Sequence, residues 1–403
     1  MKIYVHPALR FLIEKACDRR PLANSCLVFI SQLYLKAAER RNFEEYSPLQ
    51  SRISVAVYTT RFYGPMIRLL RELGVVEMKD GGRYYPGVVS KSYRLAQGYR
   101  CGVIQGVLDC PKLEMRLNRL MDRSSYKAMV GPARKWILQT YHGVGFTEAT
   151  TGLLEQHPFK SEAARNCAMH HTENITAGRL RFKVCAGSGR VYYPVANLPK
   201  VIRAELLIDG SEVAEIDIAA SQPTLLATLY AEPCPESDRY LTFVQGGRFY
   251  EAIAEWAGKS WTRDEAKTEF FNQIAFGSYY CAAKYDLLVP FSQQFPLLAA
   301  KMATIKKGGN TSLPLQMQKL EAAIAIDGAC GECAREGIKI LPVHDSLICR
   351  RTDVARVEEI FARHWFLVTG IPASLKINVR ATEGEPSHLS SPLTRERPSP
   401  DEL

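Results

Sequence analysis

The sequence predicts an α+β protein that folds as two or three packed units. Its 403 residues are too many for one ordinary hydrophobic core, and 46% of them are apolar, as in folded chains. Two pairs of apolar, strand-like runs are each joined by a polar turn, which predicts β-hairpins. Helical periodicity covers several of the stretches between them. Hairpins combined with separate helices are typical of the α+β class.

Charge and hydropathy favour a nucleic-acid partner and argue against a membrane protein. The net charge is +10 and the pI is about 9.0, a surplus that favours a polyanion, usually nucleic acid. No apolar run approaches the roughly 18–20 residues of a membrane span. The N-terminal residues carry charges throughout and lack the apolar core of a signal peptide. We therefore expect a cytoplasmic protein of a bacterial or phage-infected cell.

The eleven cysteines fit a reducing compartment, because their spacing does not form a disulfide framework. Cys330 and Cys333 form the one close pair, in GACGEC. A structural zinc site needs four ligands, and no second CxxC or histidine pair accompanies this one. We expect both cysteines to be structural, within a helix.

Residues 1–96 predict a winged-helix-like unit that binds nucleic acid. Helical periodicity covers residues 22–40 and 61–75, and Gly74 stands where the second helix stops. The runs VVEM and VVSKSYRLA flank the turn KDGGRYYPG, which predicts a hairpin. Four basic residues on this hairpin are expected to contact DNA phosphates as a wing does: Lys79, Arg83, Lys91 and Arg94. A unit used only for packing is the alternative.

The remainder divides into three parts. Residues 97–178 are predicted to form a helical linker or thumb region, to which the sequence assigns no chemistry. Residues 179–382 contain the segments that carry chemistry. Residues 383–403 are rich in proline, serine and charge, so we expect a disordered tail.

An aspartate ends a predicted strand at residue 217. In EVAEIDIAASQPTLLATLY, residues 212–230, the side chains from Val213 to Asp217 alternate in polarity, as in a half-buried strand. Ser221 is placed to cap the next helix, with Pro223 in its first turn. A carboxylate at such a strand end can bind Mg²⁺ together with a nearby backbone carbonyl, here that of Ile218. An aspartate that only ends a strand is the commoner case.

A cationic helix is predicted over residues 261–280, WTRDEAKTEFFNQIAFGSYY, where a capping box begins at the threonine. Arg263 and Lys267 lie four residues apart, and Phe271, Ile274 and Ser278 continue the same face. Two cations beside an aromatic ring suit a triphosphate and a base. A solvated basic edge beside a core stripe is the plainer alternative.

The run IKILPVHDSLICRR, residues 338–351, places His344 and Asp345 between two apolar strands. We expect a hairpin that holds both residues at its turn. An ordinary surface turn more often contains glycine or asparagine, so this polar pair indicates a functional site.

Taken in order, these segments resemble the palm and fingers of family A DNA polymerases and single-subunit phage-type RNA polymerases. Motif A of that superfamily is an aspartate that ends a strand, often followed by Ser-Gln, as with Asp217 and Ser221-Gln222. Motif B carries arginine, three residues, lysine and an aromatic-glycine pair, as with Arg263, Lys267 and Phe276-Gly277. Motif C is His-Asp, as in His344-Asp345. Gly189-Arg190 resembles the segment before motif A, and Met317-Gln318 the helix before motif C.

The resemblance covers residues 179–379, with departures. Two extra residues separate Asp217 from Ser221, and the spacing from Lys267 to Phe276 is one residue longer than usual. The span between motifs B and C is short, which implies reduced fingers. No segment is long enough for the 3′–5′ exonuclease domain of the DNA polymerases.

The resemblance implies a palm-type antiparallel sheet with helical fingers and thumb, and a nucleotidyltransferase that extends a primer on a nucleic-acid template. It implies two Mg²⁺ ions, or Mn²⁺, bound by Asp217, Asp345 and the Ile218 carbonyl, with Lys267 as a further catalytic residue. The nucleoside triphosphate would contact Arg263, Lys267, Phe271 and Phe276, and Tyr279 or Tyr280 if the register is shifted. The primer and template would contact Arg190, Gln318 and His344.

The resemblance leans slightly toward RNA or primer synthesis on a DNA template. Pro223 and Thr224 follow Ser-Gln where the DNA polymerases place a glutamate that blocks the ribose 2′-hydroxyl, but Phe276 stands where the RNA polymerases carry a tyrosine. One alternative is a DNA-dependent DNA polymerase without exonuclease. Others are a nuclease with the same metal pair and a winged-helix replication initiator or regulator whose palm is structural.

Overall fold

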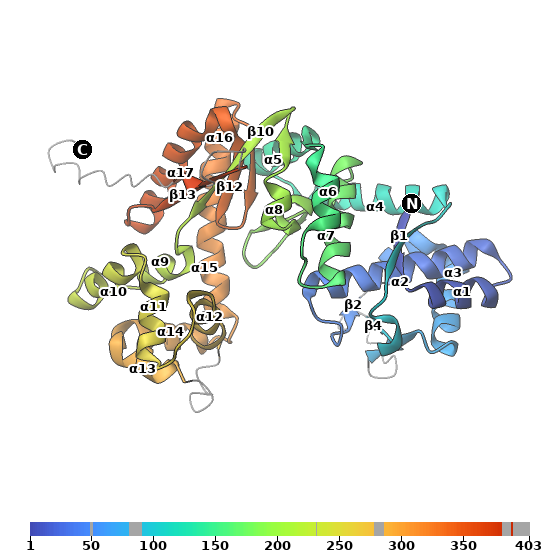
Figure 1. Ribbon diagram of the computed structural model, residues 1–403, viewed down its shortest axis with the longest axis horizontal. Coiled ribbons are helices and arrows are strands. Elements are labelled where there is room, and N and C mark those ends of the chain that lie inside the picture. The colour runs from blue at the N-terminus through green and yellow to red at the C-terminus, as the bar shows by residue number, and fades with distance from the viewer. Residues whose placement is uncertain (49–50, 80–90, 231, 278–285, 381–387, 390–403) are drawn as a thin grey trace. The chain divides into compact units, whose positions relative to one another are not determined.

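The computed structural model describes residues 1–48, 51–79, 91–230, 232–277, 286–380 and 388–389 (Figure 1). The chain forms two compact units: unit 1 comprises residues 1–129, 145–183 and 192–206, and unit 2 comprises residues 130–144, 184–191 and 207–403. The predicted boundaries at residues 96 and 178 differ from this division, because residues 97–178 contribute to both units. Among the described residues, no helix is both long enough and apolar enough to cross a membrane.

Unit 1 begins with helices and a small sheet in alternation. Its elements are α1 (Pro7–Ala16), α2 (Arg20–Arg40), β2 (Ser47–Pro48), α3 (Ser51–Glu72), β3 (Val76–Met78) and β4 (Ser92–Leu95). The strands form an antiparallel sheet in the order β2-β4-β3, with Val76 opposite Leu95. The hairpin strands therefore form as predicted, whereas the turn with Arg83 lies outside the described residues.

Helix α3 consists of two helices that meet at Thr59. This residue has φ of 65° and ψ of 158°, far from helical values, so the backbone turns there. The second helix, residues 60–72, corresponds to the one predicted at 61–75. It ends before Gly74, which adopts φ of 64°, and the Val75 N–H donates to the Leu70 carbonyl at 2.9 Å. Glycine is favoured at this left-handed position because it has no Cβ.

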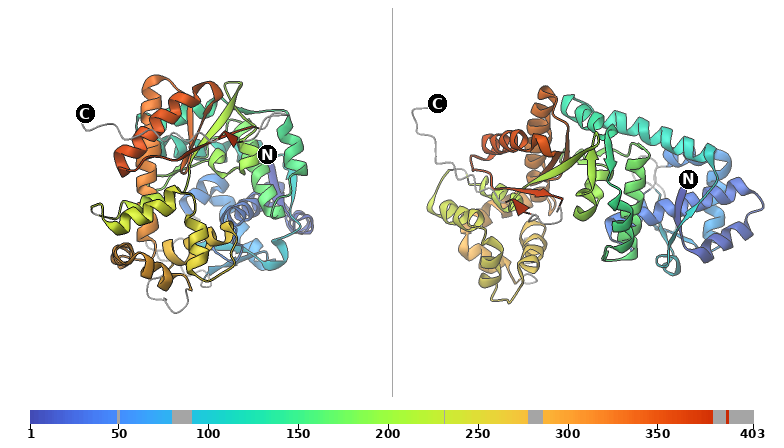
Figure 2. Two further views of the ribbon diagram at one scale, coloured as in Figure 1. Left: turned by 60° about the vertical axis from the view of Figure 1, so that its left-hand side comes forward. Right: turned by 45° about the horizontal axis from the view of Figure 1, so that its top comes forward.

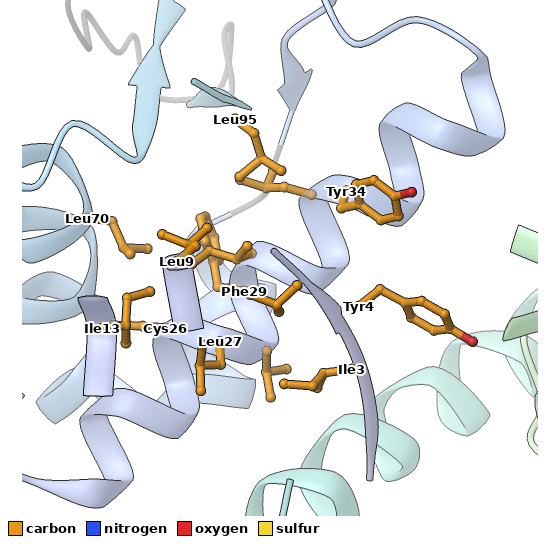
Figure 3. Close-up of a cluster of buried hydrophobic side chains, with 14 of the residues drawn as sticks. Ile3, Tyr4, Leu9, Ile13, Cys26, Leu27, Phe29, Tyr34, Leu70 and Leu95 are labelled. Atoms are coloured by element: carbon orange, nitrogen blue, oxygen red, sulfur yellow. The ribbon is translucent and has the colours of Figure 1, made fainter. Parts of the chain in front are cut away.

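Helix α2 runs through the core of unit 1, so apolar residues occur all around it. The ring of Phe29 makes edge contacts with Tyr58, at 6.0 Å between centroids, and with Tyr93, at 5.6 Å. Figure 3 shows this cluster, to which α1, α3 and the first strand contribute Leu9, Ile13, Leu70 and Ile3.

The rest of unit 1 is mostly helical. Strand β1 (Lys2–Val5) pairs antiparallel with β5 (Ile104–Val107), and the main helices are α4 (Pro111–Ala128), α6 (Ala149–Gln156) and α7 (Glu162–Thr176). Helix α7 packs on α2, and α4 packs on α3. Shorter elements are β6 (Val144–Phe146), β7 (Lys183–Val184), β8 (Val191–Tyr192) and α8 (Lys200–Arg203).

Unit 2 is built on an antiparallel sheet whose central strand is β10 (Ser211–Ile218). The strand order is β11 (Ile340–Val343), β12 (Ser346–Arg350), β10, β13 (Leu375–Val379) and β14 (His388–Leu389) (Figures 1 and 2). Strand β9 (Leu206–Ile208) also pairs with the start of β10. Helices combined with antiparallel sheets confirm the predicted α+β class.

Helices pack on the sheet of unit 2, and a longer helical segment lies next to it. Helix α17 (Val354–Thr369) packs on β10 and β12, and α5 (Pro132–His142) packs on β11. Helix α15 (Ser312–Ala322) runs into a π-helical turn (Ala323–Cys330) and then α16 (Gly331–Glu336). Cys330 and Cys333 are fully buried here, as the structural interpretation predicted.

The rest of the described part of unit 2 is mainly helical. Its helices include α10 (Pro235–Gln245), α11 (Phe249–Trp256), α12 (Arg263–Glu269), α13 (Leu288–Gln294) and α14 (Pro296–Lys306). Aromatic rings fill their centre, with Tyr240 in edge contact with Phe249 and Phe295 at 5.5 and 5.0 Å between centroids. This aromatic core fixes the position of α12, which carries the predicted Arg-Lys pair.

Candidate active site

The structure brings Asp217 and Asp345 together at one end of the sheet of unit 2. Asp217 is the penultimate residue of β10 and lies opposite Ser346, the first residue of β12. Asp345 precedes Ser346, and its carbonyl accepts a hydrogen bond from the Ile218 N–H at 3.4 Å. The two carboxylates therefore come from neighbouring positions on adjacent antiparallel strands.

The alternation predicted for β10 explains why Asp217 is available at this end. Ala214, Ile216 and Ile218 are buried against the helices, whereas Glu215 and Asp217 are only partly buried. Because side chains of a strand alternate between faces, the apolar residues fix the face on which Asp217 lies.

His344 and Asp345 occupy a two-residue turn between β11 and β12, since Val343 pairs with Ser346. His344 adopts a left-handed conformation, with φ of 56°. Non-glycine residues adopt this conformation at a cost, and tight hairpin turns usually place Asn-Gly there. The Ser346 hydroxyl donates to the Val343 carbonyl at 3.0 Å and lies 2.8 Å from a Glu215 carboxylate oxygen, which ties the turn to β10.

Burial raises the pKa of the Asp345 carboxyl to about 7, and repulsion by Glu321 and Asp217 adds to the shift. The neighbouring backbone and Arg190 oppose it only weakly. Three carboxylates close enough to repel one another favour a cation at this point, because a cation removes that repulsion.

Glu321, on α15, links two segments at the site, and the sequence prediction missed it. Its side chain is almost completely buried and accepts hydrogen bonds from Arg190, Gln222 and Ser221, the last at 3.3 Å. These partners come from the loop between β7 and β8 and from the start of α9 (Ser221–Ala227). A buried carboxylate that accepts three hydrogen bonds is well satisfied. These bonds hold the Glu321 carboxylate in place and also hold the side chains of its three donors.

The loop that carries Arg190 is held against α15 by two glycines. Gly189 adopts φ of 74°, and a Cβ there would lie 3.5 Å from Ala322. A Cβ on Gly187 would lie only 3.0 Å from Leu315. Glycine at these two positions lets the loop approach α15 closely, and this approach places Arg190 beside Glu321. The structure thus explains why a glycine precedes the arginine.

Ser221 does not cap α9 as predicted. The residue before the helix is Ala220, in a left-handed conformation without a side-chain cap, and Ser221 is the first helical residue. Its hydroxyl hydrogen-bonds Glu321 instead. The two residues inserted after Asp217 make room for this left-handed turn.

Helix α12 begins at the predicted capping box and ends earlier than predicted. The Thr262 hydroxyl accepts from the Glu265 N–H at 3.3 Å, and the Glu265 carboxylate accepts from the Thr262 N–H at 2.8 Å. After Glu269 the chain forms a π-helix (Phe270–Ala275). Its wider turns change the register, so Ile274 is fully buried rather than on the face of the two cations. The predicted continuous stripe is wrong beyond Phe271, and Ser278 lies outside the described residues.

Arg263 and Lys267 are exposed, and Tyr250 of α11 connects their helix to the aspartates. The Arg263 guanidinium lies 5.4 Å from the centre of the Tyr250 ring and 3.5 Å from Glu251. Burial raises the pKa of the Tyr250 phenol, the nearby Arg263 opposes the shift, and the charge of Asp345 adds to it. Tyr250 therefore lies within electrostatic range of both Arg263 and Asp345. The sequence prediction missed this residue as well.

Two aromatic side chains that follow the cations in the sequence contact each other. The rings of Phe271 and Phe276 are 6.0 Å apart, and Phe276 is half exposed. The buried Lys306 donates to the carbonyls of Ile274 and Gly277, the latter at 2.8 Å, and thereby supports the end of the π-helix. Burial lowers the pKa of Lys306 to about 8. Tyr279 and Tyr280 lie outside the described residues.

The other predicted residues are less closely grouped. Gln318 lies one helical turn before Glu321 on α15, and Met317 beside it is buried. Among the predicted wing residues, Lys79 is exposed. Arg94 instead forms ion pairs with Glu77 at 2.7 Å and Glu44 at 3.0 Å, so its charge is already compensated.

The donor set at Asp217 and Asp345 fits Mg²⁺. Magnesium prefers oxygen ligands and is usually bound by one or two carboxylates together with substrate phosphates. No group of three or more histidine, cysteine, aspartate or glutamate side chains with metal-site geometry occurs in the described part of the chain. A site in which the metal is bound by two carboxylates, the Ile218 carbonyl and substrate oxygens agrees with the ligand preference of magnesium. It also agrees with the absence of a larger ligand group among the described residues.

No protein-family model and no curated protein matches this sequence. Among solved structures, the chain is similar to the POL domain of Pol1 from M. smegmatis, in complex with DNA primer-template and dNTP. The sequence identity is 15% and the TM-score is 0.40. The match covers 65% of this chain and 63% of that one, less than two thirds of the polymerase domain. A likeness of this size supports no functional argument, so the proposal below depends on the geometry of the site.

Proposed function

We propose that this chain is a template-directed nucleic-acid polymerase that adds nucleotides to a primer 3′-hydroxyl. The observation that carries the proposal is the pairing of Asp217 and Asp345 at one end of adjacent strands. The oxygen-rich pair, the Arg190–Glu321 link and the exposed Arg263 and Lys267 all belong to unit 2. Template-directed incorporation that requires a divalent metal is the direct test.

Asp217, Asp345 and the Ile218 carbonyl would bind two Mg²⁺ ions, or Mn²⁺ in their place. Such a pair lowers the pKa of the attacking hydroxyl and neutralises charge on the leaving pyrophosphate. His344, at the turn beside Asp345, is proposed to contact the primer end. Tyr250, whose ring centre lies 5.4 Å from the Arg263 guanidinium, is proposed to exclude water from the site.

Arg190 and Gln318 are proposed to contact the primer and template. The Arg190 Nε is buried without a hydrogen-bond partner among the described residues. Buried donors are rarely left unpaired, so bound substrate is a suitable partner. Glu321 is proposed to position Arg190 and Gln222, and thus to act through them.

Arg263 and Lys267 are proposed to bind the triphosphate, with Phe271 and Phe276 against the base. Lys267→Ala should lower kcat about 100-fold or more, since Lys267 would protonate the departing pyrophosphate. Arg263→Ala should mainly raise the nucleotide KM, by about tenfold, because it removes one charge-assisted contact. Single-nucleotide incorporation kinetics measure both constants.

Lys259→Ala is the matched control for these variants. Lys259 lies in the loop between α11 and α12, and its charge is already paired with Asp286 at 3.1 Å. It should keep native kinetics. If Lys267→Ala and Arg263→Ala instead lose template binding at unchanged kcat and KM, α12 is a template surface.

Sugar selection is proposed to be weak, with ribonucleotides accepted at least as well as deoxyribonucleotides. Excluding a 2′-hydroxyl needs a bulky or charged side chain beside the sugar, and Pro223 and Thr224 are neither. Requiring a 2′-hydroxyl needs a polar partner, which Phe276 cannot be, although Tyr279 or Tyr280 can. Competition between NTP and dNTP at equal concentration measures the ratio.

A strong dNTP preference would favour a DNA-dependent DNA polymerase. A strong NTP preference that disappears in Tyr279→Phe or Tyr280→Phe would identify that tyrosine as the sugar contact. Comparing DNA and RNA templates, with and without primers, extends the same assay to template choice and initiation.

For unit 1 we propose a winged-helix-like fold that binds nucleic acid. The supporting observation is the element order: helix α2, strand β2, two helices that meet at Thr59, and the hairpin strands β3 and β4. The sheet order β2-β4-β3 agrees with this arrangement.

A further inference from the structure

The second helix of α3, residues 60–72, has two distinct faces. Met66 and Leu70 are fully buried in the core of unit 1. The opposite face is exposed and presents Arg61, Arg68 and Arg71. Positions three, four and seven apart share one side of a helix, so these arginines form a row along the solvent face.

The three arginines are not compensated by carboxylates. In the part of the chain that the structure describes, no acidic side chain lies within ion-pair distance of them, and the Arg61 guanidinium lies 5.6 Å from the centre of the Phe62 ring. On the strand side of the same unit, Arg94 pairs with Glu77 and Glu44. Among these described elements, the arginines of α3 therefore carry positive charge without an acidic partner, whereas Arg94 does not.

A groove of about 550 Å³ adjoins this row. Arg68, Arg71 and Lys91 line it together with Tyr63 and Tyr93, whose hydroxyls lie 3.2 Å apart. The cations outnumber the one acidic lining residue, Glu72, so the groove suits a polyanion.

Gly64 lies on the same face, between Arg61 and Arg68. It is exposed, and a Cβ added there would meet nothing within 4 Å outside its chain neighbours and the helix backbone. Glycine lowers helix propensity, but Pro65 follows it inside the helix, and a Cβ at residue 64 would crowd the proline ring. The absence of a side chain at Gly64 leaves the helix surface open to close approach by a ligand backbone.

We propose that Arg61, Arg68 and Arg71 of α3 bind the phosphate backbone of duplex DNA, with Gly64 at the point of closest approach. An exposed helix fits the major groove of B-form DNA, whereas the major groove of A-form RNA is too narrow to admit it. The proposed ligand is thus duplex DNA rather than duplex RNA. This inference rests on the nucleic-acid binding proposed for unit 1 and not on the polymerase activity, because α3 belongs to unit 1.

The test is binding of the full-length protein, without nucleotide, to a blunt DNA duplex of about two helical turns. Arg61→Gln, Arg68→Gln and Arg71→Gln are combined in one variant. Each lost phosphate contact should lower the slope of log Kd against log salt by about one, so the total change should be about three. Fluorescence anisotropy between about 50 and 200 mM salt gives the slope.

Three further variants make the result specific. Lys15→Gln, Arg19→Gln and Arg20→Gln, combined, remove the same charge from exposed positions at the end of α1 and the start of α2, and should leave the slope close to native. Gly64→Glu adds a carboxylate to this face and should weaken duplex binding at least tenfold. Gly64→Gln has similar size without the charge and should bind much better than Gly64→Glu.

Circular dichroism melting separates loss of binding from loss of folding, and Gly64→Glu and Gly64→Gln should melt at similar temperatures, because both add a side chain before Pro65. Equal slopes for the native protein and the α3 variant would overturn the proposal. So would equal effects of the α1–α2 control variant, or equally tight binding of duplex RNA.

Discussion

Asp217→Ala and Asp345→Ala are each expected to reduce nucleotide incorporation about 1,000-fold or more. Metal-assisted charge stabilisation supplies several kcal/mol to the transition state, and either substitution removes a ligand of the proposed metal pair. Both variants should fold, because burial and repulsion already hold the pKa of Asp345 near neutrality and removal of one carboxylate relieves that repulsion. Single-turnover primer extension measures the loss, and thermal melting checks the fold.

Glu212→Gln is the matched control, at the other end of the same strand. Glu212 pairs with Arg351 at 3.0 Å and lies opposite Leu207 of β9. The Glu212→Gln substitution removes one carboxylate from β10, and the variant should keep native activity. Substantial incorporation by either aspartate variant at saturating metal would contradict the assignment of the metal ligands.

Glu321→Ala is expected to lower both stability and activity. Its loss leaves the Arg190 guanidinium, 15% exposed, without its carboxylate, and breaking such a buried pair costs about 3–5 kcal/mol. Gln222 and Ser221 lose their acceptor as well. Urea unfolding measures the change in free energy, and kcat and KM are measured on the folded protein.

The double variant Arg190→Met with Glu321→Leu separates the structural role of Glu321 from its positioning role. Replacing both partners with apolar residues of similar volume is often neutral for stability, so the free energy of unfolding should recover except for the contribution of the hydrogen bonds that Ser221 and Gln222 no longer donate. Primer affinity should stay low, because Arg190 is absent. If the double variant regains both stability and native kinetics, the Arg190–Glu321 pair has no part in catalysis.

Local patterns allowed much of the sheet to be predicted from the sequence. Polarity alternation located β10 and its face, and apolar runs on both sides of His344-Asp345 located the β11–β12 hairpin. The capping box located the start of α12. Each of these signals depends on residues that are near one another in sequence.

Features that depend on distant residues were not predictable. Glu321 lies 100 residues from Ser221, and nothing in its own helix indicates a polar link to the loop of Arg190. The π-helix after Glu269 depends on packing of the aromatic core and on Lys306, so the stripe through Ile274 was extrapolated too far. The compensation of Arg94 required Glu44, 50 residues away. For Glu321, the one available sign was an acidic residue one turn after Gln318.

The measurement that tests the central claim most directly is primer extension by the native protein on templates that differ in the first coding base. With Mg²⁺ present, we predict that each template directs addition of its complementary nucleotide, and that chelation of the metal abolishes the addition. Asp217→Asn and Asp345→Asn proteins should show no addition under the same conditions. If the folded native protein adds neither NTPs nor dNTPs on DNA or RNA templates, with Mg²⁺ or Mn²⁺, the pair of aspartates is not a polymerase site.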